Sequence, residues 1–355
     1  MTFGAVPLAR FAPPMIVPTR ISFASHDLER EGCMHPSIAV DVMAIIASSG
    51  VMLEAVQQLH RLAKLPDPVI IVGDTGTGKS MLARLLHRES ERPGALAELS
   101  AGELDGTLGQ DQLFGHERGA FTGAFSRRRG IFAEAGGGTV LLDDFQHLGH
   151  REQLLLLRVL DAQEYRPLGA DRRVSVQARL VIGVNRDLDE LVASRALVPD
   201  LRYRLGYHVV HLPRLAERPE DIPLLADRFL HECEGPAGEI TPTGFTLEAL
   251  TALEFADWPG NVRQLKQVVR TAFTSALGEQ EIRLEHLPEA VRMVPKFEPH
   301  ATAAYKHRVV AWALQRSGGR IQGAARLLGV HRNTITALRP VAARAVRSRG
   351  NARSA

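Results

Sequence analysis

The stretch Gly73–Ser80 combines the residue types that hold a phosphate group. It matches the pattern G-x-x-x-x-G-K-[ST]. Glycines let backbone N–H groups surround phosphate oxygens, the Lys79 ammonium suits the β- and γ-phosphates, and the Ser80 hydroxyl suits Mg²⁺. We therefore expect ATP and Mg²⁺ to bind at Gly73, Asp74, Thr75, Gly76, Thr77, Gly78, Lys79 and Ser80.

Two adjacent carboxylates, Asp143 and Asp144, follow the apolar run Val140–Leu142. At the end of a strand, Asp143 would ligate Mg²⁺ together with Ser80, and Asp144 would act as a general base that orients water. Asn185 follows a second apolar run. Its amide would report the γ-phosphate by hydrogen bonding; the alternative is a turn that only caps the strand.

The segments around these residues alternate between strand-like and helix-like patterns. A β-branched run, Val69–Val72, precedes the phosphate motif, and a helical pattern, Met81–Glu89, follows it, as the motif requires. Strands that alternate with helices predict a parallel α/β sheet. Further strands are expected at Thr139–Leu142 and Leu180–Val184, and further helices at Met52–Leu62 and Gln153–Leu160.

Changes in composition divide the chain into five predicted parts. Residues 1–45 form a short, partly disordered arm with a helical stretch beginning near Ile38. The others are an α/β ATPase domain at 46–218, a helical subdomain at 219–290, a linker at 291–304 and a basic domain with its tail at 305–355.

Charge is unevenly distributed along the chain. Of the 43 Lys and Arg residues, eleven lie between Ala301 and Ala355, where there is no Asp or Glu. The rest of the chain carries 32 basic and 40 acidic side chains, a net charge of −8. A segregated basic end is typical of a nucleic-acid-binding module, and the alternative is a solvated basic tail.

The remaining composition indicates a protein of the cytoplasm, associated with the nucleoid. The two cysteines, Cys33 and Cys233, are far apart and lack a partner motif, which argues against a disulfide framework or a zinc site. No apolar run reaches the roughly 18 residues of a membrane span. The N-terminal segment alternates prolines and arginines, which disfavours a signal peptide.

The basic end has the pattern of a helix-turn-helix. Ile321, Ala324, Ala325 and Leu328 form one apolar helical face, Gly329 makes a turn, and a second helix follows. An earlier helix, 305–315, completes a three-helix unit. Pro340 ends the second helix early. The arginines around and after it are expected to meet phosphates: Arg339, Arg344, Arg347, Arg349 and Arg353. The predicted DNA-contacting side chains are His331, Arg332, Asn333 and Thr336.

Between the two phosphate-site motifs lies Leu113–Arg118, followed by the hexapeptide Gly-Ala-Phe-Thr-Gly-Ala. On this hexapeptide the chain resembles the sigma-54-dependent transcriptional activators, the bacterial enhancer-binding proteins of the AAA+ class. Further matching stretches are Val181–Leu188, Glu217–Leu225 and Trp258–Leu265, and the basic end resembles a Fis-type domain. An exposed aromatic residue between two glycines also fits a mobile loop that waits for a partner.

The resemblance implies an AAA+ parallel sheet flanked by helices, an all-α lid subdomain and a helix-turn-helix domain. It implies a ring, a hexamer in the family, in which Arg204 reaches the neighbouring subunit's ATP and Arg263 of the lid senses nucleotide. It also implies enhancer DNA and sigma-54 RNA polymerase holoenzyme as partners. The residues that would contact sigma-54 are Gly119, Ala120, Phe121, Thr122, Gly123 and Ala124.

Three positions depart from the family pattern, and all three concern hydrolysis. Asp144 replaces the usual glutamate and is shorter by one methylene, Ser100 replaces an asparagine, and Val198 replaces the first of two arginine fingers. Either the chain hydrolyses ATP slowly alone and needs a more active paralogue in a mixed ring, or Arg195 or Arg202 substitutes for the lost arginine.

Three functions are consistent with these residues. The first is an ATP-hydrolysing activator that opens sigma-54 promoter complexes, and the second is a weakly hydrolysing DNA-bound co-regulator in a hetero-oligomer. The third, an unrelated AAA+ machine such as a helicase loader, is disfavoured by the intact hexapeptide. About 45 residues ahead of the ATPase domain are too few to fold a receiver domain, so we expect regulation by expression level or a binding partner.

Overall fold

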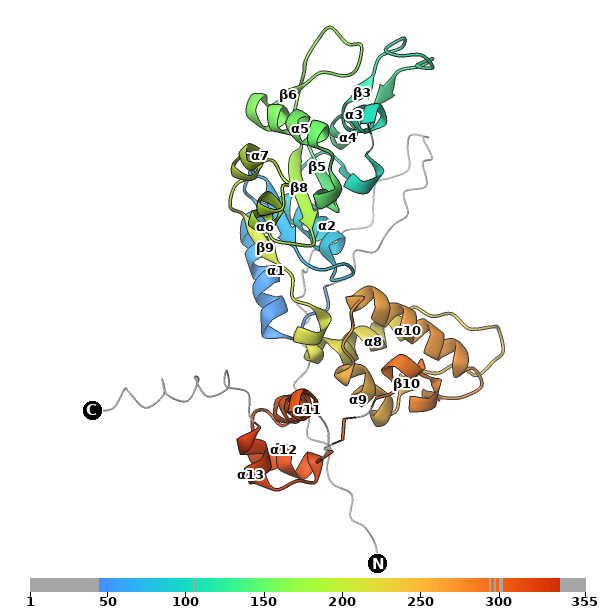
Figure 1. Ribbon diagram of the computed structural model, residues 1–355. Helices are drawn as coiled ribbons and strands as arrows, with labels where there is room; N and C mark the ends of the chain where they lie inside the picture. The colour runs from blue at the N-terminus through green and yellow to red at the C-terminus, as the bar shows by residue number, and fades with distance from the viewer. Residues whose placement is uncertain (1–44, 105, 294, 297, 300–302, 339–355) are drawn as a thin grey trace, which may run out of the picture. The chain divides into compact units, whose positions relative to one another are not determined.

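The computed structural model describes residues 45–104, 106–293, 295–296, 298–299 and 303–338 (Figure 1). The chain divides into two compact units. The first contains the residues up to Leu225 together with Trp258–Leu265, and the second contains Ala226–Asp257 together with the residues from Lys266 onward. The expected helix near Ile38 and the arginine-rich tail beyond Leu338 lie outside the described residues. Residues 258–265 group with the first unit because they pack on the phosphate loop.

A five-stranded parallel sheet forms the centre of the first unit. Its strand order is β2-β5-β8-β1-β9, so all carboxyl ends lie at one edge. In such a sheet the ligand site lies outside these carboxyl ends. The strands are β2 (Leu96–Ser100), β5 (Thr139–Asp143), β8 (Arg179–Val184), β1 (Val69–Val72) and β9 (Val209–His211).

Helices cover both faces of this sheet, because successive residues of a buried strand point to opposite sides. In β1, Val69 and Ile71 belong to the core beneath α1 (Gly50–Ala63) and α2 (Lys79–Ser90). Ile70 and Val72 belong to the core on the other face. That face is covered by α3 (Gly106–Phe114), α4 (Ile131–Ala135), α5 (His150–Ala162) and α7 (Pro199–Arg204).

A buried arginine connects the end of α1 to the sheet. Arg179, in β8, is 1% exposed and donates hydrogen bonds of 2.9–3.0 Å to the carbonyls of Leu62, Ala63 and Asp67. Burial lowers the pKa of Arg179 to about 10, so the guanidinium stays charged at neutral pH. A cation at the final carbonyls of a helix satisfies acceptors that the helix itself leaves open.

Short elements complete the first unit. Two antiparallel hairpins, β3 (Gly115–His116) with β4 (Arg128–Arg129) and β6 (Glu164–Tyr165) with β7 (Val174–Ser175), carry the loops of most interest here. The larger elements are connected by the helix α6 (Leu188–Ala193) and by four 3₁₀ segments: Ala101–Glu103, Phe145–His147, Leu215–Glu217 and Pro219–Asp221.

The second unit is mainly helical. Its last three helices bury Val310, Ala313, Ala324 and Ile335, and Gly329 makes the turn at φ 65°. Two of its helices, α8 (Ile222–His231) and α10 (Asn261–Ser275), begin in the first unit. The other helices are α9 (Leu247–Phe255), α11 (Ala303–Arg316), α12 (Ile321–Leu328) and α13 (Arg332–Ala337). The unit also contains a small parallel pair, β10 (Gly244–Phe245) with β11 (Glu281–Ile282), and the 3₁₀ segments Leu284–His286 and Glu289–Val291. Among the described residues, no helix is long and apolar enough to cross a membrane.

Candidate nucleotide and partner sites

The predicted phosphate loop connects β1 to α2. Gly76 and Gly78 have φ of 80° and 112°, a backbone region that favours glycine. Lys79 is only 6% exposed, and its ammonium donates hydrogen bonds to the carbonyls of Gly73 (3.0 Å) and Asp74 (3.5 Å). The loop therefore already surrounds one buried cation, which suits an anionic ligand.

The predicted magnesium ligands meet at the edge of the sheet. The Ser80 hydroxyl donates to Asp143 Oδ2 at 3.1 Å, and Asp143 Oδ1 accepts from the backbone N–H of Asp144 at 2.9 Å. Gly183 leaves room for this carboxylate, since a Cβ there would lie 2.3 Å from Asp143 Oδ1. A hydroxyl beside a carboxylate is a donor set that fits Mg²⁺.

The general-base candidate and its neighbours lie around this pair. Asp144 has φ of 51°, and its Oδ1 accepts from Gln146 Nε2 at 3.3 Å. Ser100 ends β2 in register with Asp143 of β5, so this departure from the family pattern lies at the predicted metal ligand. Asn185 directly follows β8, and its buried Oδ1 has no hydrogen-bond partner among the described residues. A buried acceptor without a donor is costly, which fits a side chain that faces a ligand.

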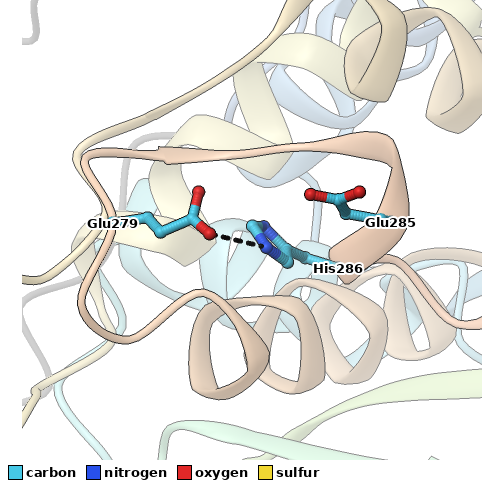
Figure 2. A group of neighbouring side chains, drawn as sticks. All are labelled: Glu279, Glu285 and His286. Atoms are coloured by element: carbon cyan, nitrogen blue, oxygen red, sulfur yellow. Dashed lines mark ion pairs between the residues drawn. The ribbon is translucent and has the colours of Figure 1, made fainter.

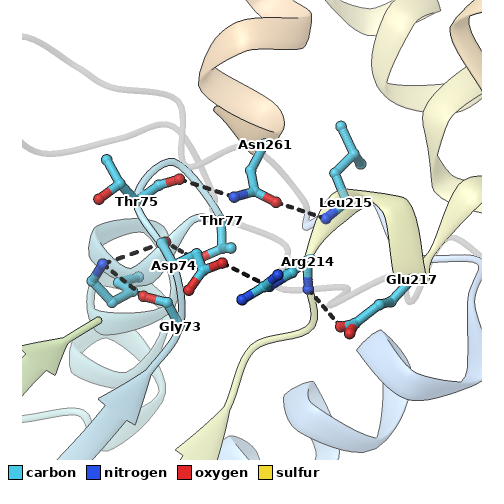
Figure 3. Close-up of polar contacts among 9 residues, drawn as sticks. Gly73, Asp74, Thr75, Thr77, Arg214, Leu215, Glu217 and Asn261 are labelled. Atoms are coloured by element: carbon cyan, nitrogen blue, oxygen red, sulfur yellow. Dashed lines mark hydrogen bonds and ion pairs between the residues drawn. The ribbon is translucent and has the colours of Figure 1, made fainter. Parts of the chain in front are cut away.

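Asn261 holds the phosphate loop from the side, a role that local sequence reasoning missed. This residue is 1% exposed; its Nδ2 donates to the Thr75 carbonyl at 3.0 Å and its Oδ1 accepts from the Leu215 N–H at 2.8 Å (Figure 3). The backbone N–H groups of Val262 and Arg263 lie 2.9 and 3.4 Å from the Gly76 carbonyl. The predicted nucleotide sensor Arg263 is thus adjacent to the loop through its backbone.

Two further arginines contact the same loop and were also missed. Arg214 pairs with Asp74 at 2.7 Å, and its backbone N–H donates to Glu217 (Figure 3). Arg218 is 3% exposed and donates to the Thr77 carbonyl at 2.8 Å. Burial lowers the pKa of Arg218, and Asp221 opposes that effect. No local signal distinguishes Arg214 from the exposed arginines of the chain, whereas Arg218 lies in the matching stretch Glu217–Leu225, which could have identified it.

The arginines proposed for the neighbouring subunit's ATP differ in their surroundings. Arg204, at the end of α7, is 54% exposed by its side chain and pairs with Asp161. Arg202 is 12% exposed and bonds to Asp189 (2.9 Å) and to the Gly206 carbonyl (3.1 Å). These contacts tie Arg202 to its own subunit and disfavour it as a substitute finger. Arg195 is exposed.

The hexapeptide Gly119–Ala124 lies in the loop between β3 and β4. Gly119 and Gly123 have φ of 83° and 99°, and the Gly119 N–H donates to the Ala124 carbonyl at 2.8 Å. Phe121 is 45% exposed and Phe125 is 87% exposed. An exposed aromatic pair on a short loop is a surface suited to a protein partner.

The helix-turn-helix presents its predicted DNA contacts to solvent. His331 caps α13 and accepts from the Asn333 N–H at 3.3 Å, and the Thr336 hydroxyl donates to the Arg332 carbonyl at 3.0 Å. All four residues are exposed. The helix ends at Ala337, ahead of Pro340.

A separate group in the second unit, Glu279, Glu285 and His286, has the composition of a metal site (Figure 2). However, Arg283 pairs with both carboxylates, at 3.3 and 3.7 Å. The His286 ring lies 3.5 Å from Glu279 and accepts from the Arg283 N–H at 3.0 Å. These contacts satisfy the group as an ion-pair network, and we assign it no metal.

Three family models match the chain. The sigma-54 interaction domain matches residues 45–211, the AAA+ ATPase lid domain matches 216–304, and the bacterial regulatory protein, Fis family, matches 307–337. Together they confirm the predicted fold class: a parallel sheet flanked by helices, a helical lid and a C-terminal helix-turn-helix domain.

Named transcriptional regulators and a solved structure are similar to most of this chain. The sequence is 37% identical over 314 residues to the transcriptional regulatory protein ZraR of Salmonella typhimurium, covering 86% of this chain and 70% of that protein. It is 36% identical over 300 residues to the formate hydrogenlyase transcriptional activator FhlA of Escherichia coli, covering 82% and 43%. The structure is similar to NtrX from Brucella abortus in complex with ADP, with a TM-score of 0.70, 26% identity, and coverage of 86% and 70%.

Proposed function

We infer the function from family membership: this chain belongs to the sigma-54-dependent transcriptional activators of the AAA+ class, with a Fis-type DNA-binding domain. We propose that it binds enhancer DNA and uses ATP to remodel the closed complex of sigma-54 RNA polymerase. The observation that carries the proposal is the hexapeptide Gly119–Ala124, whose Phe121 and Thr122 are exposed and which belongs to the same compact unit as the phosphate loop.

In this proposal the phosphate loop binds ATP, and Lys79 contacts the β- and γ-phosphates. Ser80 and Asp143 hold Mg²⁺, which would screen the charge of the phosphates. Asp144 orients the attacking water, and Asn185 senses the γ-phosphate. Support comes from the 3.1 Å contact between Ser80 and Asp143 and from the ADP complex of NtrX.

Hydrolysis in this family needs a ring, and we propose a hexamer in which Arg204 of one subunit reaches the ATP of the next. Arg263 would sense the nucleotide within its own subunit. Support for the first role is that the Arg204 side chain is 54% exposed, with its ion pair to Asp161 in a solvated place. Such an exposed pair contributes little and separates easily.

A second candidate function is a slowly hydrolysing co-regulator that works in a mixed ring with a more active paralogue. The observation that favours it is that two departures from the family pattern, Ser100 and Asp144, lie beside Asp143. In addition, Arg202 bonds within its own subunit and is therefore a poor substitute for the arginine that Val198 replaces. A displacement of about 1 Å in a catalytic group can cost on the order of 100-fold in rate.

Enhancer recognition in this proposal belongs to α13. Arg332 and Asn333 are the side chains that suit guanine and adenine edges, and His331 and Thr336 complete the exposed face. An enhancer-bound ring would hold the hexapeptide loops at a high local concentration near the promoter.

The test is capture of sigma-54 by the full chain in the presence of ADP and aluminium fluoride, which mimics the transition state of hydrolysis. We expect the wild type to capture sigma-54 and Thr122→Ala to lose most of that capture. Thr274→Ala, which changes an exposed threonine of the lid, is the matched control. Failure of the wild type to capture sigma-54 would refute the proposed function.

A further inference from the structure

Three side chains converge at the base of the hexapeptide loop. His116 lies on β3 and Arg128 on β4, and Asp111 comes from the helix α3 just before them. Asp111 Oδ1 lies 2.5 Å from His116 Nδ1, and Asp111 Oδ2 accepts a hydrogen bond of 3.0 Å from Arg128 Nη1. We call Asp111, His116 and Arg128 the loop-base cluster.

Two members of this cluster, Asp111 and His116, are buried, whereas the Arg128 side chain is about half exposed. Asp111 is 2% exposed and His116 is 8% exposed. A buried carboxylate is costly unless it is paired, and here both of its oxygens are used. Since the imidazole cannot rotate without breaking its hydrogen bond to Asp111, the orientation of the His116 ring is fixed.

The His116 ring in turn contacts the hexapeptide. Its centroid lies 4.9 Å from that of Phe121, with an angle of 66° between the ring planes. Edge-to-face pairs of this kind are favourable beyond the area that they bury. Phe121 is consequently half covered, at 45% exposure, whereas Phe125 four residues later is 87% exposed.

The other contacts of the loop involve its backbone and the Ala120 side chain, which lies beside Gly169. The Glu117 N–H donates to the Leu168 carbonyl at 2.9 Å, which joins this loop to the neighbouring hairpin. The Ala124 N–H donates to the Phe121 carbonyl at 3.0 Å. Among the described residues, the His116 contact is the one ring pair that Phe121 makes.

We propose that the loop-base cluster stores Phe121 against the loop base, and that Asp111 and His116 are positioning residues that set how often Phe121 is released for its partner. This inference rests on the proposed function, in which Phe121 contacts sigma-54. Release of Phe121 exposes its ring and frees the tip of the loop. The hydrogen bond between Asp111 and His116 keeps the His116 ring in position, so Phe121 can pack against it again.

The experiment compares capture of sigma-54 with ADP and with ADP plus aluminium fluoride. For His116→Ala we expect capture with ADP to rise about two- to tenfold, which corresponds to the loss of one aromatic pair, and ATP turnover to stay within about twofold of the wild type. Asp111→Asn should change capture in the same direction by less. His116→Phe keeps a ring beside Phe121 but loses the hydrogen bond to Asp111, so its capture with ADP should lie between that of the wild type and that of His116→Ala.

His87→Ala is the matched control, because His87 is a partly buried histidine of the same unit that bonds to Thr139 at 2.9 Å, away from this loop. Thermal unfolding of each variant identifies any loss of fold, and if His116→Ala does not fold, His116→Phe and Asp111→Asn decide the question. The inference is overturned if ADP-state capture is unchanged in His116→Ala and Asp111→Asn, or if His116→Phe behaves like His116→Ala.

A second measurement is independent of sigma-54. 4-Fluorophenylalanine at position 121 gives a ¹⁹F resonance that we expect to shift toward its solvent-exposed value in His116→Ala and to stay unchanged in His87→Ala. An unchanged resonance in His116→Ala contradicts the storage contact even when capture works. If the wild type does not capture sigma-54 but the expected ¹⁹F shift occurs in His116→Ala, the proposed function is refuted and the contact between His116 and Phe121 stands.

Discussion

The phosphate loop and the hexapeptide loop are built from similar residues but are held in opposite ways. Both contain glycines with positive φ, Gly76 and Gly78 in one loop and Gly119 and Gly123 in the other. The phosphate loop is closed by buried side chains from distant segments, above all Asn261. The hexapeptide loop bonds mainly to itself and to its neighbouring hairpin. Glycine content therefore permits both conformations, and the surrounding contacts decide which loop is rigid and which can move.

The largest effect expected is at the buried cation of the rigid loop. Lys79→Ala should weaken ATP binding by about 100-fold or more, because it removes a preorganised charge from a site with little access to water. Titration with a fluorescent ATP analogue measures this effect, and Lys266→Ala, an exposed lysine that pairs with Glu232, is the control. Equal affinity in the Lys79 variant would contradict the assignment of this loop as the ATP site.

Lengthening the side chain of the proposed general base, Asp144, should have the next largest effect. If the short side chain of Asp144 limits hydrolysis, Asp144→Glu raises ATP turnover on the order of 100-fold. Phosphate release by the full chain at ring-forming concentration measures this rate. Equal turnover in the two proteins would show that Asp144 does not limit hydrolysis, and rapid turnover by the wild type alone would reject the co-regulator function.

Removal of the Asn261 side chain should weaken the support of the phosphate loop while the charge of Lys79 stays in place. Asn261→Ala leaves the Leu215 N–H and the Thr75 carbonyl without partners, at a cost of about 1–3 kcal/mol. We expect the KM for ATP to rise about tenfold, with a smaller change in kcat. Gln163→Ala, an exposed amide, should leave both constants unchanged. An unchanged KM in Asn261→Ala would show that the loop does not depend on this bridge.

The smallest expected effect is a difference in unfolding free energy between substitutions at one glycine of each loop, Gly76 and Gly123. An added Cβ at Gly76 would lie 2.5 Å from the Gly260 carbonyl oxygen, whereas at Gly123 it would meet nothing within 4 Å. Both substitutions strain a positive φ, so Gly123→Ala should lower the unfolding free energy by about 1 kcal/mol and Gly76→Ala by more. Chemical denaturation measures both values, and equal losses would contradict the distinction between a rigid and a movable loop.

Local patterns predicted much of this fold. The buried runs of β1, β5 and β8 and the apolar face of α12 follow directly from residue type and spacing, and the structure places these elements there. The strands β2 and β9 were not predicted. Leu96–Ser100 is only partly buried, and β9 is three residues long, so neither has a strong local pattern.

The supporting residues of both loops could not be predicted, because each acts through a distant segment or through geometry. Asn261 lies 186 positions after Thr75, and no local pattern relates two residues that far apart. Asp111 and His116 are close in sequence, yet their pairing depends on the angle between α3 and β3 and on burial that the sequence does not display. Motifs predicted the groups that would contact a ligand, and the structure shows which residues hold those groups.

The central claim is that ATP use at the rigid loop drives the movable loop against sigma-54 RNA polymerase. Permanganate reactivity of unpaired thymines at a sigma-54 promoter tests it most directly, with holoenzyme, the full chain and either ATP or ADP. We predict thymine reactivity near the start site with ATP, none with ADP, and loss of the ATP signal in Thr122→Ala. Reactivity that is absent with ATP although the chain hydrolyses it, or that persists in Thr122→Ala, would contradict the account.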